Sequence, residues 1–272
     1  MNAYYYLTKH AKFEGTSKGL SFHVDKGLVD KPDKKATIDT AIKHFEISET
    51  IGVKGDRTVE YIKKFGMYEE RYDNHLFKPL AGHQAEHMIF ESTSNLWIGT
   101  GSHSILDTML SLHRIYGVPY IPGTALKGVA AHYCHSYLGL QNEKFLQGGE
   151  WYTILFGSQD QQSFIYYYDA FPTPETVAAS LRRDIMTPHH TEYNMSSAGQ
   201  ARNAPRDDDS PVPHLFMSAK ADFNVMLSCE NNDDAGREWL NAAKRILIQA
   251  IQQEGVGGKT NVGYGRFKLK EG

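Results

Sequence analysis

The sequence predicts an α+β domain of the ferredoxin-like type, in which an antiparallel sheet carries two helices on one face. The first observation behind this prediction is the order of hydrophobic patterns along residues 86–270, which reads strand, helix, strand, strand, helix, strand. The second is that both helical patterns have an apolar face at three- and four-residue spacing. We expect a single domain of residues 1–272, in which residues 1–85 form an appendage before the ferredoxin-like core. Residues 172–213 are expected to be a long insertion within that core.

The first half of this order begins at residues 87–98, where the letters HMIFESTSNLWI are typical of a strand followed by a glycine-rich turn. A second extended stretch is expected at residues 112–121, before a Pro-Gly pair. A helix is then expected from residue 124 to about residue 138. Its apolar face consists of Leu126, Val129, Ala130, Tyr133, Cys134 and Tyr137.

The middle of the chain predicts further strands. Residues 164–171 (FIYYYDAF) have the aromatic content of a strand, and residues 215–229 alternate well enough for one strand or for two that bend at Asp222. The insertion between them, residues 172–213, is rich in Pro, Asp, Asn and Ser and is expected to be irregular.

The last helix and strand complete the order. Asp233 or Asp234 is expected to cap the helix, and Gly255 to end it. The final strand is expected at residues 262–269. The apolar face of this helix consists of Trp239, Leu240, Ala243, Leu247, Ala250 and Ile251.

The composition limits the classes of function. Hydrophobic residues make up 40% and charged residues 22%, which excludes a wholly disordered chain. The net charge of −3, from 29 basic and 32 acidic residues, argues against a protein that binds nucleic acid strongly by itself. Cys134 and Cys229 are expected to be reduced and buried. No run of 18 apolar residues is present, so we expect no transmembrane span and a cytoplasmic protein.

Residues 255–267 (GVGGKTNVGYGRF) form the first motif, with five glycines in its first eleven residues. Glycine allows positive φ and a close approach to the backbone amides, and successive amides can bind a phosphate. Lys259 and Arg266 add positive charge, and Tyr264 offers a face on which a base could stack. A nucleotide P-loop is excluded, because the first glycine of that pattern would fall at Gln253, the loop follows a helix, and no helix follows Thr260. A glycine loop that serves packing alone remains an alternative.

Residues 120–128 (YIPGTALKG) form the second motif, at the start of the first helix. Thr124 is expected to be the N-cap, which places Lys127 in the first turn. A cation there opposes the helix dipole by roughly 0.3–1 kcal/mol. That cost is explained if an anion such as a phosphate binds at the same end of the helix. The alternative is a lysine that faces solvent.

These two motifs resemble the two signatures of the RAMP superfamily of CRISPR proteins, and the resemblance covers roughly residues 86–270. Within that superfamily the chain resembles the subunit-six family of the type III-B (Cmr) effector complex. Three shorter pieces support this placement: residues 155–158 (LFGS), residues 168–170 (YDA), and residues 184–190 (DIMTPHH) with the Pro-Val-Pro of residues 211–213. RNA-recognition domains have the same ferredoxin-like arrangement.

The resemblance implies a non-catalytic subunit of an antiviral ribonucleoprotein, one that holds the 3′ part of the guide RNA. The implied partners are the guide RNA (crRNA), its duplex with the target RNA, and other RAMP subunits. No cofactor, no metal and no catalytic residue are implied. The residues expected to face RNA are Gly123, Thr124, Lys127, Gly257, Gly258, Lys259, Thr260, Asn261, Gly263, Tyr264, Gly265 and Arg266.

Two other functions remain open. One is a RAMP-type endoribonuclease that processes guide RNA with a histidine as general base, and the other is a scaffold whose glycine loop serves packing only. His189 and His190 lack helical ligand spacing, so a surface role is favoured over a metal site with Asp184, Glu192 and His214. His103 and Asp107 have no surrounding motif typical of a triad, and residues 207–209 (DDD) are most simply a solvated loop. In the first helix His132 is expected beside the apolar face and His135 nearer solvent.

Overall fold

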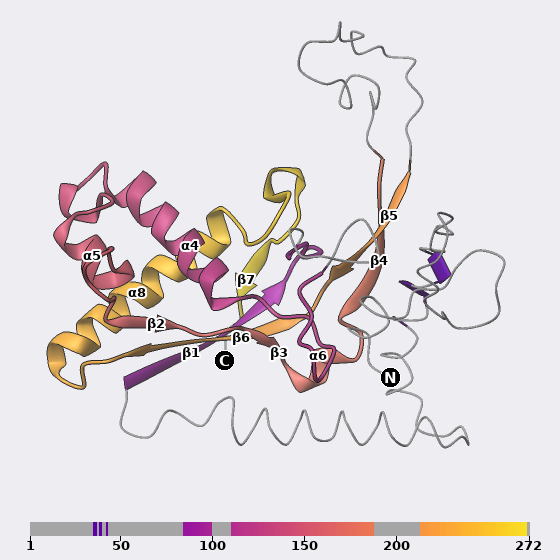
Figure 1. Ribbon diagram of the computed structural model, residues 1–272, viewed down its shortest axis with the longest axis horizontal. Coiled ribbons are helices and arrows are strands. Elements are labelled where there is room, and N and C mark those ends of the chain that lie inside the picture. Colours follow the sequence, from indigo (N-terminus) through magenta and orange to yellow (C-terminus); the bar gives the residue numbers. More distant parts are fainter. Residues whose placement is uncertain are drawn as a thin grey trace, which may run out of the picture.

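The computed structural model describes residues 84–99, 110–187 and 213–270, together with Lys35, Ala36, Ile38, Asp39 and Ile42, which are helical. The predicted sites at His103, His189 and residues 207–209 lie outside this part of the chain. The described elements form a central antiparallel sheet with helices on one face and a two-stranded hairpin at one end (Figure 1). The predicted α+β class with an antiparallel sheet is therefore confirmed.

The sheet is built around two long neighbouring strands, β1 (Gln84–Ser92) and β6 (Asp222–Cys229). The strand order is β2-β6-β1-β7, where β2 is Ile165–Tyr167 and β7 is Phe267–Leu269, and β3 (Phe171–Pro172) also pairs with β6. The register places Phe90 opposite Phe223, and both side chains are buried. All eight residues of β6 are buried, and the strand lies inside the sheet, between β2 and β1.

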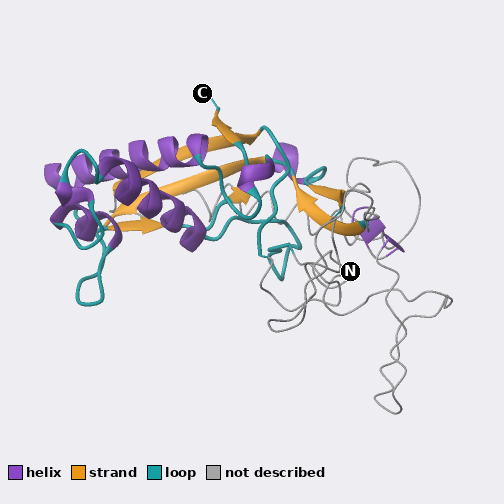
Figure 2. Cartoon of the chain, turned by 90° about the horizontal axis from the view of Figure 1, so that it is seen from above, coloured by secondary structure: helices purple, strands orange, loops and turns teal. Residues whose placement is uncertain are grey.

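Two helices cover one face of this sheet, and Figure 2 shows them from above. Helix α4 (Gly123–Tyr133) continues into a π-helical turn, η2 (Cys134–Leu138), which confirms the predicted extent. Leu126, Ala130 and Tyr133 are buried on its predicted face, whereas Tyr137 at the far end is 46% exposed. Two short helices follow α4 in the chain, η3 (Glu143–Phe145) and α5 (Glu150–Phe156). The second helix on this face of the sheet is α8 (Asp234–Gln253).

Helix α8 (Asp234–Gln253) is the longest described element. Asp233 caps it, because its Oδ1 accepts a hydrogen bond of 2.7 Å from the amide of Gly236. Gly255 follows the C-cap Glu254 and terminates the helix with a φ of 80°, the left-handed conformation typical of that position. On its predicted apolar face Trp239 is half-buried and the other five residues are buried. Both the cap and the end of this helix are confirmed.

Several predicted strand limits are wrong. The strand predicted at residues 87–98 begins three residues earlier and ends at Ser92, because pairing with β6 stops there and Leu96 bridges Ala219 instead. The stretch at residues 112–121 makes isolated bridges and a tight turn, and is not a strand of the sheet. The aromatic strand at residues 164–171 is divided into β2 and β3. The last strand is shorter than predicted, because residues 260–262 form a turn of 3-10 helix, η4 (Thr260–Val262).

The predicted irregular insertion contains regular structure. A short helix, α6 (Pro174–Val177), is followed by β4 (Leu181–Met186), which pairs in antiparallel fashion with β5 (His214–Ala219). The two strands extend away from the central sheet (Figure 1). β5 ends at Ala219 and β6 begins at Asp222, so the prediction of two strands that bend at Asp222 is confirmed.

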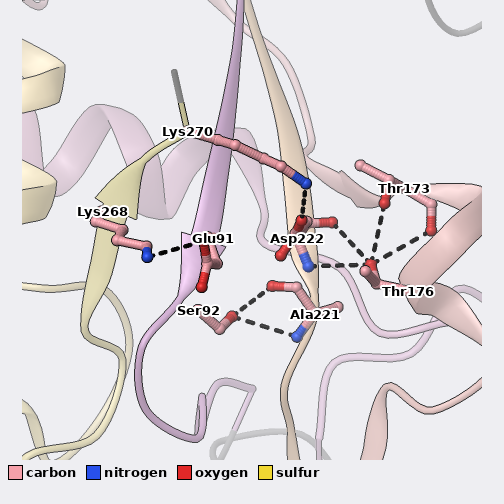
Figure 3. Close-up of polar contacts among 8 residues, drawn as sticks. All are labelled: Glu91, Ser92, Thr173, Thr176, Ala221, Asp222, Lys268 and Lys270. Atoms are coloured by element: carbon pink, nitrogen blue, oxygen red, sulfur yellow. Dashed lines mark hydrogen bonds and ion pairs between the residues drawn. The ribbon is translucent and has the colours of Figure 1, made fainter. Parts of the chain in front are cut away.

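A polar cluster holds the base of this hairpin against the central sheet (Figure 3). The Asp222 carboxylate accepts a 2.7 Å hydrogen bond from the Lys270 ammonium, and the Asp222 amide donates to Thr176 Oγ1. Hydrogen bonding to Asp222, together with its negative charge, raises the pKa of Lys270. Ser92 Oγ bridges to the backbone of Ala221. The last residues of the chain and the start of β6 are thereby joined to the end of β1.

The two cysteines agree with a further expectation. Cys134 and Cys229 are both buried and free, as predicted. Burial raises the pKa of the Cys134 thiol to about 12. In the described part of the chain, no helix has the length and apolar character needed to cross a membrane.

Candidate nucleic-acid interface

The glycine-rich loop connects the end of α8 to β7, and its backbone packs closely on the residues that follow β1. Gly257 has a φ of 91°, and a Cβ atom there would lie 2.6 Å from the carbonyl oxygen of Trp97. Gly265 has a φ of 64°, and a Cβ atom there would collide with the carbonyl of Val256. Close packing therefore requires glycine at both positions, independently of any ligand.

Most backbone amides of the glycine loop donate hydrogen bonds to other groups of the protein. Gly258 donates to the Trp97 carbonyl at 2.7 Å, and Gly265 donates to the Asn95 carbonyl at 2.8 Å. The amide of Val256 donates to the Gly265 carbonyl, which closes the loop at its base. The amides of Gly257 and Lys259 donate to no backbone carbonyl among the described residues. The loop is thus clamped at its base, and only part of it could act as the predicted phosphate nest.

Lys259 lies between these clamped residues and has a left-handed backbone conformation, with a φ of 57°. Its side chain is exposed, and the ammonium lies 5.5 Å from the centre of the Trp97 ring. Such a cation–π contact at an exposed site contributes roughly 0.5–1 kcal/mol. No carboxylate forms an ion pair with Lys259 in the described segments, so its charge is available to a ligand.

Arg266, which was expected to face RNA, binds the protein's own backbone. Its Nη1 donates to the Gln253 carbonyl at 2.7 Å and its Nη2 donates to the Thr260 carbonyl at 2.9 Å. The first of these carbonyls is at the C-terminus of α8, where a cation is favoured by the helix dipole. Arg266 therefore joins the end of α8 to the tip of the loop, and its predicted contact with RNA stays a prediction.

Tyr264 is also held by the protein. Its hydroxyl donates a 2.9 Å hydrogen bond to Asp184 Oδ2 on β4, and its ring lies 6.0 Å from that of Phe216 on β5. Asp184 also accepts from Asn95 Nδ2 at 2.9 Å. Burial, followed by the hydrogen bond to Asp184 and its charge, raises the pKa of Tyr264 to about 12. These contacts connect the loop to the β4–β5 hairpin. Thr260, Asn261 and Gly263 lie at the loop tip, and the last two are exposed.

At the other motif the structure corrects the predicted cap of α4. Pro122 occupies the N-cap position, and the predicted N-cap, Thr124, is the second residue of the helix. The amide of Gly123 instead donates to Asp169 Oδ1 at 2.7 Å, so a carboxylate of the protein occupies the end where an anion was expected. Lys127 is half-buried and forms no ion pair with the described residues.

Among the described residues, no hydrogen bond or ion pair joins the motif of residues 120–128 to the glycine loop. Gly123 packs on the backbone of Tyr167 in β2, whereas the glycine loop packs beyond the end of β1. β2 and β7 are at opposite ends of the strand order. A polar contact between α4 and the end of α8 is made by His132, whose Nδ1 lies 2.9 Å from the Glu254 carboxylate.

Three residues at these sites were not predicted from the sequence: Trp97, Asp184 and Asp169. Asp169 is in the YDA piece and Asp184 begins the DIMTPHH piece, so the resemblance marked their segments without giving their roles. His132 and His135 are both exposed, and His132 contacts Glu254 at the end of α8, the helix that packs against α4. Among the described residues no group of three or more histidine, cysteine or carboxylate side chains is arranged to hold a metal ion.

Comparisons with known proteins agree with these motifs. A curated relative, the CRISPR system Cmr subunit Cmr6 of Pyrococcus furiosus, is 28% identical in an alignment 230 positions long, which covers 65% of this chain and 66% of that protein. The Cmr6 subunit of Saccharolobus solfataricus is 23% identical over 168 residues, which are 61% of this chain and 50% of that protein. The chain thus spans between half and two thirds of the length of these relatives. The resemblance to the subunit-six family is confirmed.

A solved structure shares the fold, and a family model matches most of the chain. One chain of the type III-B Cmr-beta complex bound to cognate target RNA aligns with a TM-score of 0.54 at 20% identity, over 90% of this chain and 77% of that chain. That similarity shows a shared fold. The model of the RAMP superfamily matches residues 89–268, which is more than half of the chain. The chain therefore belongs to the RAMP superfamily.

Proposed function

We propose that this chain is a guide-RNA-binding and assembly subunit of a type III-B CRISPR effector complex and that it does not itself cut RNA. The observation that carries the proposal is Lys259, an exposed cation that the clamped glycine loop holds in a fixed place. Both curated relatives are Cmr6 subunits, and the solved relative belongs to a Cmr complex bound to target RNA. Lysine at a rigid, exposed backbone position suits contact with a phosphate.

The fold supports an RNA-recognition type of domain. The order β2-β6-β1-β7 has α4 between β1 and β2 in sequence and α8 between β6 and β7. A ferredoxin-like domain has the same sequence of elements, which is the basis for assigning residues 86–270 to such a core. Residues 1–85 are then an appendage of the same domain.

The charge of the chain supports binding within an assembly. A net charge of −3 gives the isolated chain little attraction for a polyanion, so neighbouring subunits must supply further phosphate contacts. We infer that the partners are the 3′ part of the guide RNA, its duplex with target RNA, and other RAMP subunits. Filter binding by the isolated chain should show a log–log salt slope shallower than about −5, at roughly −0.7 for each phosphate contact.

One observation favours a second function, that of an endoribonuclease. His132 Nδ1 lies 2.9 Å from Glu254, and His132 Nε2 lies 3.3 Å from Ser136 Oγ. A histidine oriented by a carboxylate can act as a general base, and Glu254 immediately precedes the glycine loop. Cleavage also requires stabilisation of the phosphorane charge, and Arg266 is engaged by two carbonyls. The non-catalytic function is therefore preferred.

The RNA-holding proposal is tested by guide retention in the assembled complex. Lys259→Ala and Lys127→Ala should each lower retention and reduce the salt slope by about 0.7, because each removes one phosphate contact. Lys268→Ala is the matched control, since that lysine is exposed on β7 beside the loop and pairs with Glu91. Unchanged retention in both test variants would exclude these residues as the RNA seat.

The non-catalytic proposal is tested by RNA cleavage in the same complex. His132→Gln, and separately a double replacement of His189 and His190 by alanine, should leave every cleavage site unchanged. Loss of one cut, with guide and target binding intact, would establish the endoribonuclease function.

A further inference from the structure

A cleft of about 330 Å³ lies at the start of α4, where segments of three sequence motifs meet. The amide of Gly123 binds Asp169, and its Cα lies so close to β2 that a Cβ atom would collide with the Tyr167 carbonyl. The cleft is thus built by the tight junction of α4 with the segments that follow α5. Its walls come from the first turn of α4 and from residues 156–158, 161–163 and 165–167.

The floor of the cleft is apolar and aromatic. Phe156 and Ile165 are buried, and the Phe156 ring stacks on that of Tyr167 at 6.1 Å and 26°. The volume is at the lower end of the roughly 300–1,000 Å³ found for small-ligand sites. A planar group of the size of one nucleoside fits this space, whereas a duplex does not.

The rim of the cleft carries neutral hydrogen-bonding groups. Gln161 and Gln162 are exposed, and Gln162 Nε2 donates to the Tyr166 hydroxyl at 3.1 Å. The side chains of Gln161 and Thr124 make no hydrogen bond within the described part of the chain. Amides and hydroxyls both donate and accept, as the edge of a nucleobase and a ribose hydroxyl require.

The charge of the lining suits one phosphate. Lys127 is its single cation and no carboxylate is among the lining residues. The N-terminus of α4 adds little further attraction for a phosphate, because its amides are already engaged. The Gly123 amide donates to Asp169, and the amides of Ala125 and Leu126 donate to the Pro122 carbonyl. A continuous strand of phosphates would need more positive charge than this lining offers.

We propose that this cleft holds a single unstacked nucleotide of the bound RNA. Its base lies on the aromatic floor, its edge faces Gln161 and Gln162, and its phosphate lies at Lys127. This inference rests on the proposed function, because it takes the RNA to be the guide. It adds a site for a base to the phosphate contact at Lys127, at the opposite end of the strand order from the glycine loop.

The test uses the assembled complex, loaded with guides that each contain one 4-thiouridine at a different position. After irradiation, one guide position should crosslink to a peptide within residues 156–167. Gln161→Trp fills the cleft and should lower that yield by about tenfold, the equivalent of losing one base–aromatic contact. Gln159→Trp is the matched control, because Gln159 is exposed on the same turn and does not line the cleft.

Yields are expressed per bound guide, so the inference and the proposed function fail in different ways. If Lys259→Ala leaves guide retention unchanged while the cleft crosslink persists, the glycine loop does not bind the guide and the cleft does. The inference is overturned if no guide position crosslinks to residues 156–167, or if Gln161→Trp crosslinks as well as Gln159→Trp. A photoreactive residue placed at position 161 that captures a neighbouring subunit, and no guide, would assign the cleft to protein and also overturn it.

Discussion

Replacing Arg266 by methionine separates a structural role of this residue from contact with RNA. The guanidinium donates to carbonyls of Gln253 and Thr260, which joins the C-terminus of α8 to the loop tip. Methionine keeps much of the aliphatic stem and removes both donors. If the role is structural, the substitution lowers the free energy of unfolding in the absence of any RNA.

The size of this effect follows from the two hydrogen bonds. Hydrogen bonds to charged groups contribute about 1.5–3 kcal/mol each, and the lower value applies here because Arg266 is half-buried. We therefore expect Arg266→Met to lower the free energy of unfolding by about 3 kcal/mol. Urea unfolding followed by circular dichroism measures this change for the full chain.

The matched comparison is Lys268→Met, which removes a cation two residues away in sequence that is exposed and forms a surface ion pair with Glu91. It should cost no more than about 1 kcal/mol. If Arg266→Met is as stable as Lys268→Met but loses guide RNA in the complex, the structural reasoning is refuted. Arg266 would then be an RNA contact, as the sequence first indicated.

Three further predictions test the packing of the two motifs. Gly265→Ala should cost at least about 1–2 kcal/mol in urea unfolding, because φ is left-handed and the methyl group meets a carbonyl, whereas Gly258→Ala should stay within about 0.5 kcal/mol. The pKa of Tyr264 is raised to about 12, so its contribution to stability is complete below its ordinary pKa near 10 and is lost between about 10 and 12. Tyr264→Phe should therefore lose less stability than the parent chain over that pH range in thermal unfolding. Asp169→Ala should cost about 1 kcal/mol by removing the cap on Gly123, and Asp169→Asn should keep most of it.

The helices were predictable because the information for each is local. The apolar spacing of α8, the Asp233 cap and the left-handed Gly255 all lie within the helix or no more than two residues from its ends. Strand limits depend instead on distant partners. β1 ends at Ser92 because its pairing with β6 stops at that end of the strand. The alternation of residues 87–98 does not indicate where that pairing stops.

The strands of the hairpin did not follow from local residue patterns, for a related reason. Arg182, Arg183 and Ile185 of β4 are all exposed, so this strand lacks the alternation that identifies a half-buried strand, and pairing with β5 defines it. At the sites, Asp169 caps a helix that begins 46 residues earlier in the sequence. Such contacts follow from the fold and not from local spacing.

Lys259→Gly is the last test, because it relieves the left-handed backbone conformation of this residue and also removes its positive charge. A left-handed conformation costs a non-glycine residue roughly 1–2 kcal/mol, and glycine would avoid that cost at roughly 0.5–1 kcal/mol of added chain entropy. Lys259→Gly also loses the contact with Trp97, worth about 0.5–1 kcal/mol, so the free energy of unfolding should change by less than about 1 kcal/mol. Guide retention should nevertheless fall as it does for Lys259→Ala. If retention holds in the glycine variant, the charge at this position is not what the loop is built to present.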